Sequence, residues 1–180
     1  MVNPNKIFGR LGNLMFQGAY IYAQMKRGMI PDIFLQDEIY FKEYADEIKQ
    51  IYGDGIGQIN KVAIHVRRGD YVRNPFYVDL SQTDYYEKAM AQFPNAEFLV
   101  FSDDIPFCED YFIGKEYEFC EETDEVKSLN LMASCKGVII ANSSFSWWGG
   151  FLSKGKVVSP LAWFTDKVER VGIPDSWIRV

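Results

Sequence analysis

The sequence predicts an α/β fold built on a parallel sheet, and three observations lead to this prediction. Beyond residue 60, apolar segments alternate with helix-like segments. The apolar segments are continuous runs such as VAIHV (62–66), which is typical of strands covered on both faces. Three of them end in unusual polar clusters, at 65–71, 102–104 and 142–150, and ligands bind beyond the carboxyl ends of strands in such sheets. With 180 residues, the chain can form about one domain with a substantial core.

The predicted elements follow the chain in order. Helix ends are placed where glycine or proline stops a helical segment, and strands where β-branched and aromatic residues run together. The N-terminal part is predicted to form a short strand, a loop and two helices, at 6–8, 9–13, 14–27 and 37–52. The rest is predicted to form strands at 61–66, 97–102, 116–120, 137–141 and 156–158, helices near 83–93 and over 124–135, and a short helix after Asn142. The acidic run 121–125 is interpreted as a solvated helix cap.

Charge and composition exclude several classes of protein. The formal net charge of −6 argues against a nucleic-acid-binding protein, which normally has a basic excess. His65 is the single histidine, which excludes multi-histidine zinc sites. The phosphate-binding motif GxxxxGK[ST] does not occur, so the chain is not a P-loop NTPase. Asp-x-Asp does not occur either, and a metal-bridged nucleotide-sugar site therefore has no obvious ligand set.

Cysteine usage and hydropathy predict a cytoplasmic protein. The chain has three cysteines, Cys108, Cys120 and Cys135, and no CxxC pair, which indicates reduced thiols. The N-terminus has no long apolar stretch typical of a secretory signal. No apolar run approaches the ~20 residues of a transmembrane helix. We therefore expect no membrane span, which still allows peripheral association with a membrane.

The polar clusters at the strand ends predict a site for an anion. Alternation along the strand places His65 and Arg67 on one face and the neighbouring valines and isoleucine on the other. Two adjacent arginines, Arg67 and Arg68, offer bidentate charged groups that suit a diphosphate. The stretch from Asn142 to Ser146 leads into a helix whose backbone N–H groups and hydroxyls could hold the same anion.

Each cluster also has a purely structural interpretation. His65 could be a hydrogen-bonded core residue, and the two arginines before Gly69-Asp70 could form a surface turn with a local ion pair. Ser102-Asp103-Asp104 could cap the following helix. Because three such clusters follow three aligned strands, we favour a phosphate- or nucleotide-binding α/β domain.

Several segments resemble one known family. The three blocks VAIHVRRGDYV (62–72), FLVFSDD (98–104) and LNLMASCKGVIIANSSFSWWGGFLS (129–153) resemble the motifs of α-1,2-fucosyltransferases, glycosyltransferase family 11. The segment GRLGNLMFQGA (9–19) is similar to that family's GGLGNQMFQYA opening. The resemblance implies a GT-B-like fold with a Rossmann-type parallel-sheet donor domain. It also implies inverting, metal-independent transfer of L-fucose from GDP-fucose to a sugar hydroxyl, in this family galactoside O-2, with no cofactor.

The resemblance also implies residue roles. Arg67 would hold the β-phosphate and stabilise its departure, and Asp70 and Asn13 complete the expected catalytic set. His65 and Arg68 would support the nucleotide or order the loop. The other residues expected to bind the donor are Gly12, Arg10, Asp103, Asn142, Ser143, Ser144 and Ser146. Independently of the resemblance, Asp70 is the best candidate to take the proton of the acceptor hydroxyl, because its carboxylate lies two residues beyond the arginines on the same loop. The alternative for Asp70 is that it only pairs with Arg68 or caps the loop, so that catalysis rests on leaving-group stabilisation. Trp147 and Trp148 are expected to pack in the core.

The chain departs from the family pattern in places. Arg10 replaces the family's second glycine, and Ser128 stands where many members have an acid. Family members are longer between the first helix and the strand before Arg67. We therefore expect residues 1–60 to form a truncated N-terminal α/β lobe on the acceptor side and residues 61–180 the donor domain. A second copy of the chain could cover apolar faces that the short lobe leaves.

Three alternatives remain open beside the transferase. The chain could be a non-catalytic GDP-sugar-binding module, a transferase for another nucleotide sugar, or a generic anion-binding α/β protein. The expected partners of the transferase are a GDP-sugar and a glycan acceptor.

Overall fold

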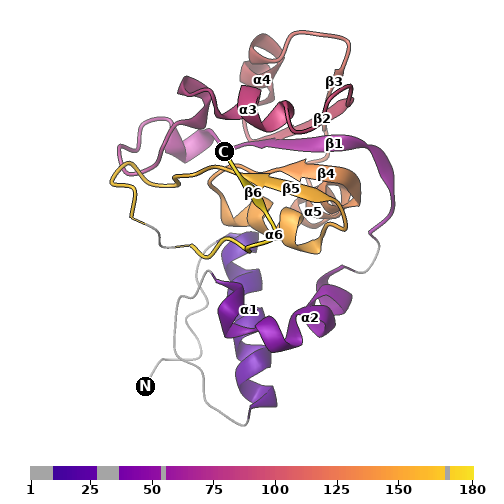
Figure 1. Cartoon of the computed structure of the whole chain (residues 1–180), viewed down its shortest axis with the longest axis vertical. Helices are drawn as coiled ribbons and strands as arrows, with labels where there is room; N and C mark the ends of the chain where they lie inside the picture. Colours follow the sequence, from indigo (N-terminus) through magenta and orange to yellow (C-terminus); the bar gives the residue numbers. More distant parts are fainter. Residues whose placement is uncertain (1–9, 28–36, 54–55, 169–170) are drawn as a thin grey trace.

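The structure is a computed structural model, which describes residues 10–27, 37–53, 56–168 and 171–180. Its centre is a sheet of six parallel strands in the order β3-β2-β1-β4-β5-β6 (Figure 1). The strands are β1 (Ile59–Val66), β2 (Phe98–Ser102), β3 (Tyr117–Phe119), β4 (Cys135–Ile139), β5 (Lys156–Ser159) and β6 (Ile178–Arg179). The predicted parallel α/β sheet is confirmed. The predicted strand at 6–8 lies outside the described residues.

The strand order places a ligand crevice between β1 and β4. From β1 the chain moves outward through β2 to β3, and from β4 it moves outward in the other direction to β6. This is the strand order of Rossmann-like folds, in which ligands bind at the carboxyl ends of the strands where the order reverses. Both β1 and β4 are followed by one of the predicted polar clusters.

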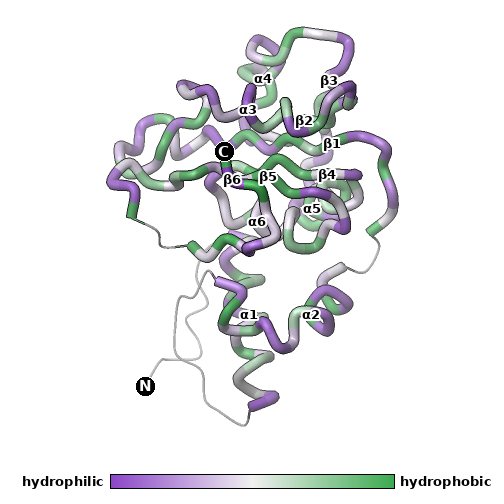
Figure 2. The backbone as a smooth tube through the Cα atoms, viewed as in Figure 1, coloured by the Kyte–Doolittle hydropathy of each residue, from purple (hydrophilic) through white to green (hydrophobic). Residues whose placement is uncertain are grey.

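Six α-helices accompany the sheet within the described residues. They are α1 (Leu11–Lys26), α2 (Ala45–Tyr52), α3 (Tyr85–Met90), α4 (Ile105–Tyr111), α5 (Glu125–Ser134) and α6 (Ser144–Leu152). On one face, Val62, Ile64 and Val66 of β1 pack with buried residues of α3 and α4. On the other face, Ala63 shares a core with residues of α1, α5 and α6. This arrangement confirms the predicted alternation along β1, and the central strands form the apolar middle of the molecule (Figure 2).

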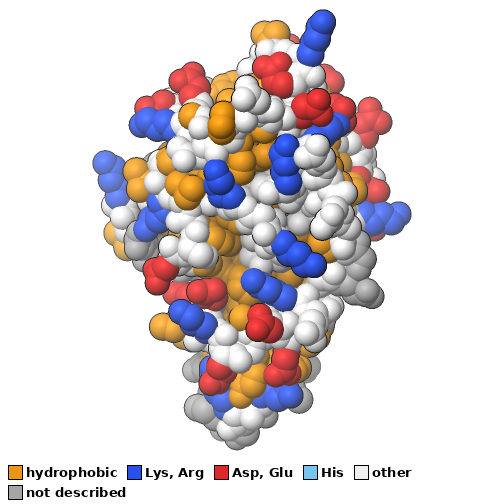
Figure 3. All heavy atoms as spheres, turned by 45° about the vertical axis from the view of Figure 1, so that its right-hand side comes forward, with side chains coloured by type: hydrophobic (Ala, Val, Ile, Leu, Met, Phe, Trp, Pro, Cys, Tyr) orange, Lys and Arg blue, Asp and Glu red, His pale blue; other side chains and the backbone are white. Residues whose placement is uncertain are grey.

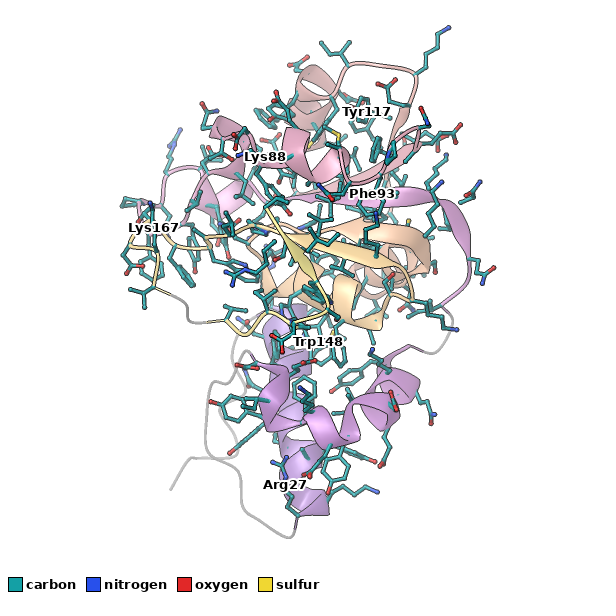
Figure 4. The ribbon with its side chains drawn as sticks, viewed as in Figure 1. Arg27, Lys88, Phe93, Tyr117, Trp148 and Lys167 are labelled. Carbon is teal, nitrogen blue, oxygen red and sulfur yellow. The ribbon has the colours of Figure 1, made fainter. Side chains whose placement is uncertain are left out.

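Helix α1 is joined to the sheet through α6. Phe16 of α1 lies against Trp147 and Trp148, with ring centroids 4.6 and 5.0 Å apart. The indole Nε1 of Trp148 donates a hydrogen bond of 3.0 Å to the carbonyl oxygen of Gly12. Both tryptophans are fully buried, and Figure 4 shows Trp148 between the sheet and the N-terminal helices. Their predicted packing role is confirmed.

The predicted single helix over 37–52 is wrong. The segment forms two short 3-10 turns, Glu38–Tyr40 and Lys42–Tyr44, before α2 begins. Phe41 separates the two turns with φ −139° and ψ 12°, outside helical geometry. This conformation lets its ring enter the core, where it is stacked 5.7 Å from Trp148. Burial of one aromatic side chain therefore outweighs helical continuity here.

Other element boundaries differ from the predicted ones by a few residues. Helix α1 begins at Leu11, earlier than predicted, and β4 covers 135–139 in place of 137–141. Strand β6 was not predicted. The division at residue 60 stays a prediction.

The surface carries both signs of charge, and the described helices do not match a membrane span. On the face seen in Figure 3, basic and acidic side chains are interspersed. Among the described residues, no helix is long and apolar enough to cross a membrane. All three cysteines are free, as predicted.

Candidate functional site

A pocket of about 550 Å³ opens at the carboxyl ends of the central strands. Its lining brings together the three predicted polar clusters and the start of α1. The predicted site residues that line it are Arg10, Gly12, Asn13, His65, Arg67, Asp70, Asp103, Ser143 and Ser144. These residues come from segments that are far apart in the sequence, so the fold assembles a single site from them.

Arg67 is the best-fixed cation of the pocket. Its side chain is 12% exposed, and its Nη1 lies 2.5 Å from Oδ2 of Asp103. Its Nη2 forms an ion pair with Asp70, and its guanidinium lies over the ring of Tyr71, 5.2 Å from the centroid. The predicted local ion pair therefore exists, but Asp70 pairs with Arg67 and not with Arg68. A guanidinium held in this way can present its remaining N–H groups to an anion.

Asp103 connects the loops that follow β1 and β2. Its Oδ1 accepts a hydrogen bond of 2.9 Å from the backbone N–H of Arg68. Its Oδ2 lies so close to Gly69 that a Cβ at that position would clash with it. A side chain at this position would therefore force Asp103 out of its place beside the Arg67 loop. The neighbouring Asp104 caps α4, since its side chain accepts from Phe107 N, which confirms the predicted capping role.

His65 lies at the floor of the pocket in the neutral form. It is 5% exposed, and burial, together with the nearby Arg67, lowers its pKa to about 3. Its ring lies 5.5 Å from that of Phe145, and its Nδ1 is buried without a hydrogen-bond partner. The prediction of a hydrogen-bonded core histidine is therefore wrong for this atom. Unpaired buried polar atoms are rare in native proteins, and a bound group at the site is one explanation.

Two helix N-termini meet at the pocket. Leu11 and Gly12 begin α1, Ser144 begins α6 after the N-cap residue Ser143, and all four line the pocket. They approach so closely that a Cβ on Gly12 would lie 2.5 Å from the carbonyl carbon of Ser144. Free N–H groups and the helix dipoles make both termini favourable for negative charge.

Three predicted donor-contacting residues do not line the pocket. Arg68 turns away from it, with its Nε 3.2 Å from Oδ2 of Asp104 and its Nη1 donating to Ser81 Oγ at 3.0 Å. Its guanidinium lies 3.4 Å from the ring centroid of Phe107. These contacts agree with the predicted alternative that Arg68 orders the loop.

Asn142 and Ser146 bond to the protein backbone. The Asn142 side-chain amide donates hydrogen bonds of 2.9 Å to the carbonyl oxygens of Val78 and Trp163, and so ties two loops together. The Ser146 hydroxyl accepts a bond of 3.1 Å from Ala141 N. Both residues shape the turn that presents Ser143 and Ser144 to the pocket.

One wall of the pocket was missed by sequence reasoning. It consists of Cys120, Glu121, Glu122, Thr123, Glu125 and Ser128, which follow β3 or belong to α5. The acidic run does cap a helix, because Asp124 accepts from Val126 N and Lys127 N. It also faces the pocket, and Glu125 pairs with Arg10 at 3.3 Å. The rule that ligands bind at strand ends could have identified this wall, because it directly follows β3. Tyr77, which also lines the pocket, was not predicted either, whereas Tyr71 ends the predicted polar cluster after β1.

The fold and the pocket define the class of protein. The chain is an α/β protein with a Rossmann-like sheet and an anion-compatible pocket where the strand order reverses. A family model described as Glycosyl transferase family 11 matches residues 19–171. The chain therefore belongs to glycosyltransferase family 11, as its motifs predict.

Known relatives agree with this membership. An Alpha-1,2-colitosyltransferase of Escherichia coli is 33% identical over 82% of this chain and 61% of its own length. An O-antigen biosynthesis glycosyltransferase WbnK of Escherichia coli is 35% identical over 67% of this chain and 45% of its own length. A Galactoside 2-alpha-L-fucosyltransferase Sec1 of Mus musculus is 25% identical over 76% of this chain and 40% of its own length. The chain thus spans about half the length of the curated relatives it matches.

Proposed function

We propose that this protein is an inverting, metal-independent glycosyltransferase that moves L-fucose from GDP-fucose to O-2 of a galactoside. The proposal is supported by the family membership and by the fucosyltransferase named among the relatives. It includes a GT-B-type architecture, with residues 61–180 as the donor domain and residues 1–60 as a reduced acceptor-side lobe. A second candidate is transfer of another sugar, because one relative is named as a colitosyltransferase.

The observation that carries the proposal is the position of Arg67. Its guanidinium is almost buried, lies at the end of β1 and faces a pocket that two helix N-termini also enter. Breaking the bond between the sugar carbon and the diphosphate leaves negative charge on a phosphate oxygen. A fixed guanidinium and helix N-termini stabilise such charge without reorganising during the reaction.

We assign to Asp70 the role of the base that acts on the acceptor hydroxyl. Its carboxylate is 71% exposed and lies beside Arg67 at the pocket. As the acceptor oxygen attacks the sugar carbon from the side opposite to GDP, Asp70 takes the hydroxyl proton. The electron pair of the breaking bond stays on the phosphate oxygen beside Arg67. Gly12 and Asn13 border the same space from the start of α1.

Replacing Arg67 with alanine tests the proposal. Removing one charge-stabilising donor typically lowers turnover by ~10²–10³, so we expect at least this loss for Arg67→Ala. The assay is incubation with GDP-fucose and a galactoside panel, with products identified by mass spectrometry. Arg73→Ala is the matched control, because Arg73 is exposed on the same loop and does not line the pocket. Near-normal transfer by a folded Arg67→Ala protein contradicts the proposal.

The same preparation separates the alternatives. Calorimetric titration with GDP and UDP should show tighter binding of GDP, and preference for UDP favours a different nucleotide sugar. Binding of GDP without transfer or hydrolysis of GDP-fucose identifies a non-catalytic binding module. Failure of the wild-type protein to bind either nucleotide favours the interpretation as a generic anion-binding protein.

A further inference from the structure

The pocket carries more negative than positive charge. Its positively charged lining residues are Arg10 and Arg67, and its negatively charged ones are Asp70, Asp103, Glu121, Glu122 and Glu125. Both arginines already have carboxylate partners, Arg10 in Glu125 and Arg67 in two aspartates. An entering diphosphate therefore meets cations that are already neutralised, and it must compete with these carboxylates.

The two aspartates that pair with Arg67 differ in how firmly they are held. Asp103 is 24% exposed, accepts the backbone N–H of Arg68 at 2.9 Å and is packed against Gly69. Moving it would break these contacts as well as the ion pair. Asp103 is therefore a permanent partner that orients the guanidinium.

Asp70 is held much less firmly. Its side chain is 71% exposed, and it lies on the short 3-10 turn Gly69–Tyr71 at the pocket. Arg67 is nearly buried, but the carboxylate of the pair faces solvent, and solvent screening and side-chain entropy weaken its hold. A diphosphate offers Arg67 stronger, bidentate hydrogen bonds than one solvent-exposed carboxylate does. Asp70 is thus the partner that a donor can displace.

We propose that Asp70 is the resident counterion of Arg67, that the diphosphate of the donor displaces it, and that the displaced carboxylate becomes the proton acceptor of the transfer step. The inference rests on the proposed function. The acceptor O–H proton passes to the Asp70 carboxylate as the acceptor oxygen bonds to the sugar carbon. The bond between that carbon and the phosphate oxygen breaks, and its electron pair stays on the phosphate held by Arg67. The base is therefore released only after the donor is bound, which makes the donor the first substrate.

The exchange predicts opposite effects of Asp70→Asn on binding and on turnover. Removing the competing carboxylate should lower the dissociation constant for GDP about two- to five-fold, the range expected for one exposed ion pair. The same variant should transfer fucose more slowly, because an amide cannot take the proton. Calorimetric titration with GDP measures the first effect, and the galactoside assay measures the second. A residue that merely supports the loop would not strengthen binding.

Two controls make the test specific. Asp84→Asn is matched in chemistry and exposure, since Asp84 is 64% exposed and forms an ion pair of 2.7 Å with Lys88. Neither residue lines the pocket, so this variant should leave GDP binding unchanged. In the Arg67→Ala background, Asp70→Asn should no longer strengthen GDP binding.

The outcomes separate this inference from the proposed function. Unchanged or weaker GDP binding by Asp70→Asn, or a gain that persists without Arg67, overturns the inference and leaves the transferase proposal standing. Absence of GDP binding by wild type overturns both.

Discussion

The neutral state of His65 makes the stability of the fold depend on pH. Burial, and then Arg67, lowers its pKa in the folded chain to about 3. In the unfolded chain a histidine titrates near pH 6.5. Between these values the unfolded chain binds a proton that the folded chain does not bind. The free energy of unfolding therefore falls as the pH falls below about 6.5, by up to ~1.4 kcal/mol per pH unit.

Replacing His65 with glutamine should remove this part of the pH dependence. We expect the loss in free energy of unfolding between pH 7 and pH 5 to be smaller for His65→Gln than for wild type, by roughly 1–2 kcal/mol. Urea unfolding of both proteins at each pH measures the difference, and carboxylates that also titrate cancel in the comparison. Parallel pH profiles of the two proteins would show that His65 is not held neutral in the fold.

The sequence predicts some pocket residues better than others. His65, Arg67, Asp70 and Asp103 were found because polar residues at the end of an apolar strand are unusual. The period of two that places Arg67 beside His65 also places Arg68 with Val66 on the opposite face. Arg68 accordingly faces Asp104 and Phe107.

Hydrogen bonds within the fold explain the remaining misses. Asn142 and Ser146 have the same residue types as pocket-lining neighbours, and only the three-dimensional structure shows that their side chains bond to the backbone. Residue type at a strand end therefore predicts the location of a site more reliably than the direction of each side chain.

At the scale of elements, the contact between α1 and α6 forms one side of the pocket. Gly12 allows it, because a side chain there would meet the backbone at Ser144 and Phe145, at 2.5 and 2.6 Å from Cβ. Trp148 fixes the same contact through its hydrogen bond to the Gly12 carbonyl. The two helix N-termini can lie together only while this position lacks a Cβ.

Gly12→Ala should therefore separate the two helices. Alanine favours a helix over glycine by about 1 kcal/mol, but the clash with α6 backbone should dominate and destabilise the fold by roughly 1–3 kcal/mol. Gly18→Ala in the same helix is the control, since its Cβ would meet the Tyr52 hydroxyl, which is the end of a side chain and can shift. Urea unfolding compares the two variants, and equal stabilities would contradict the role assigned to Gly12.

Elements with strong local signals were predicted well, and those set by tertiary contacts were not. The central strands and α5 follow apolar runs and an aspartate cap that are visible in the sequence. The segment 37–52 has helical residues throughout, yet it breaks at Phe41 because that ring is drawn into the core. The two-residue strand β6 forms only because β5 offers an edge for pairing.

At the scale of the whole molecule, one core connects the N-terminal helices with the sheet. Phe16 and Phe41, from the first part of the chain, belong to the same buried cluster as Val138 and Trp148. Such a shared core couples the two parts, so that neither should unfold without exposing apolar surface of the other. The predicted boundary at residue 60 would then separate functions of the chain without separating folding units.

Phe16→Ala tests this coupling directly. The ring is 1% exposed and contacts both tryptophans of α6, so its loss should cost about 3–5 kcal/mol and lower Tm by on the order of 10 °C. Calorimetry should show one transition that moves as a whole in the variant. Ile113→Ala is the control, because Ile113 is 82% exposed and its truncation should change stability by no more than about 0.5 kcal/mol. Two transitions, of which Phe16→Ala shifts only one, would instead make residues 1–60 a folding unit independent of residues 61–180.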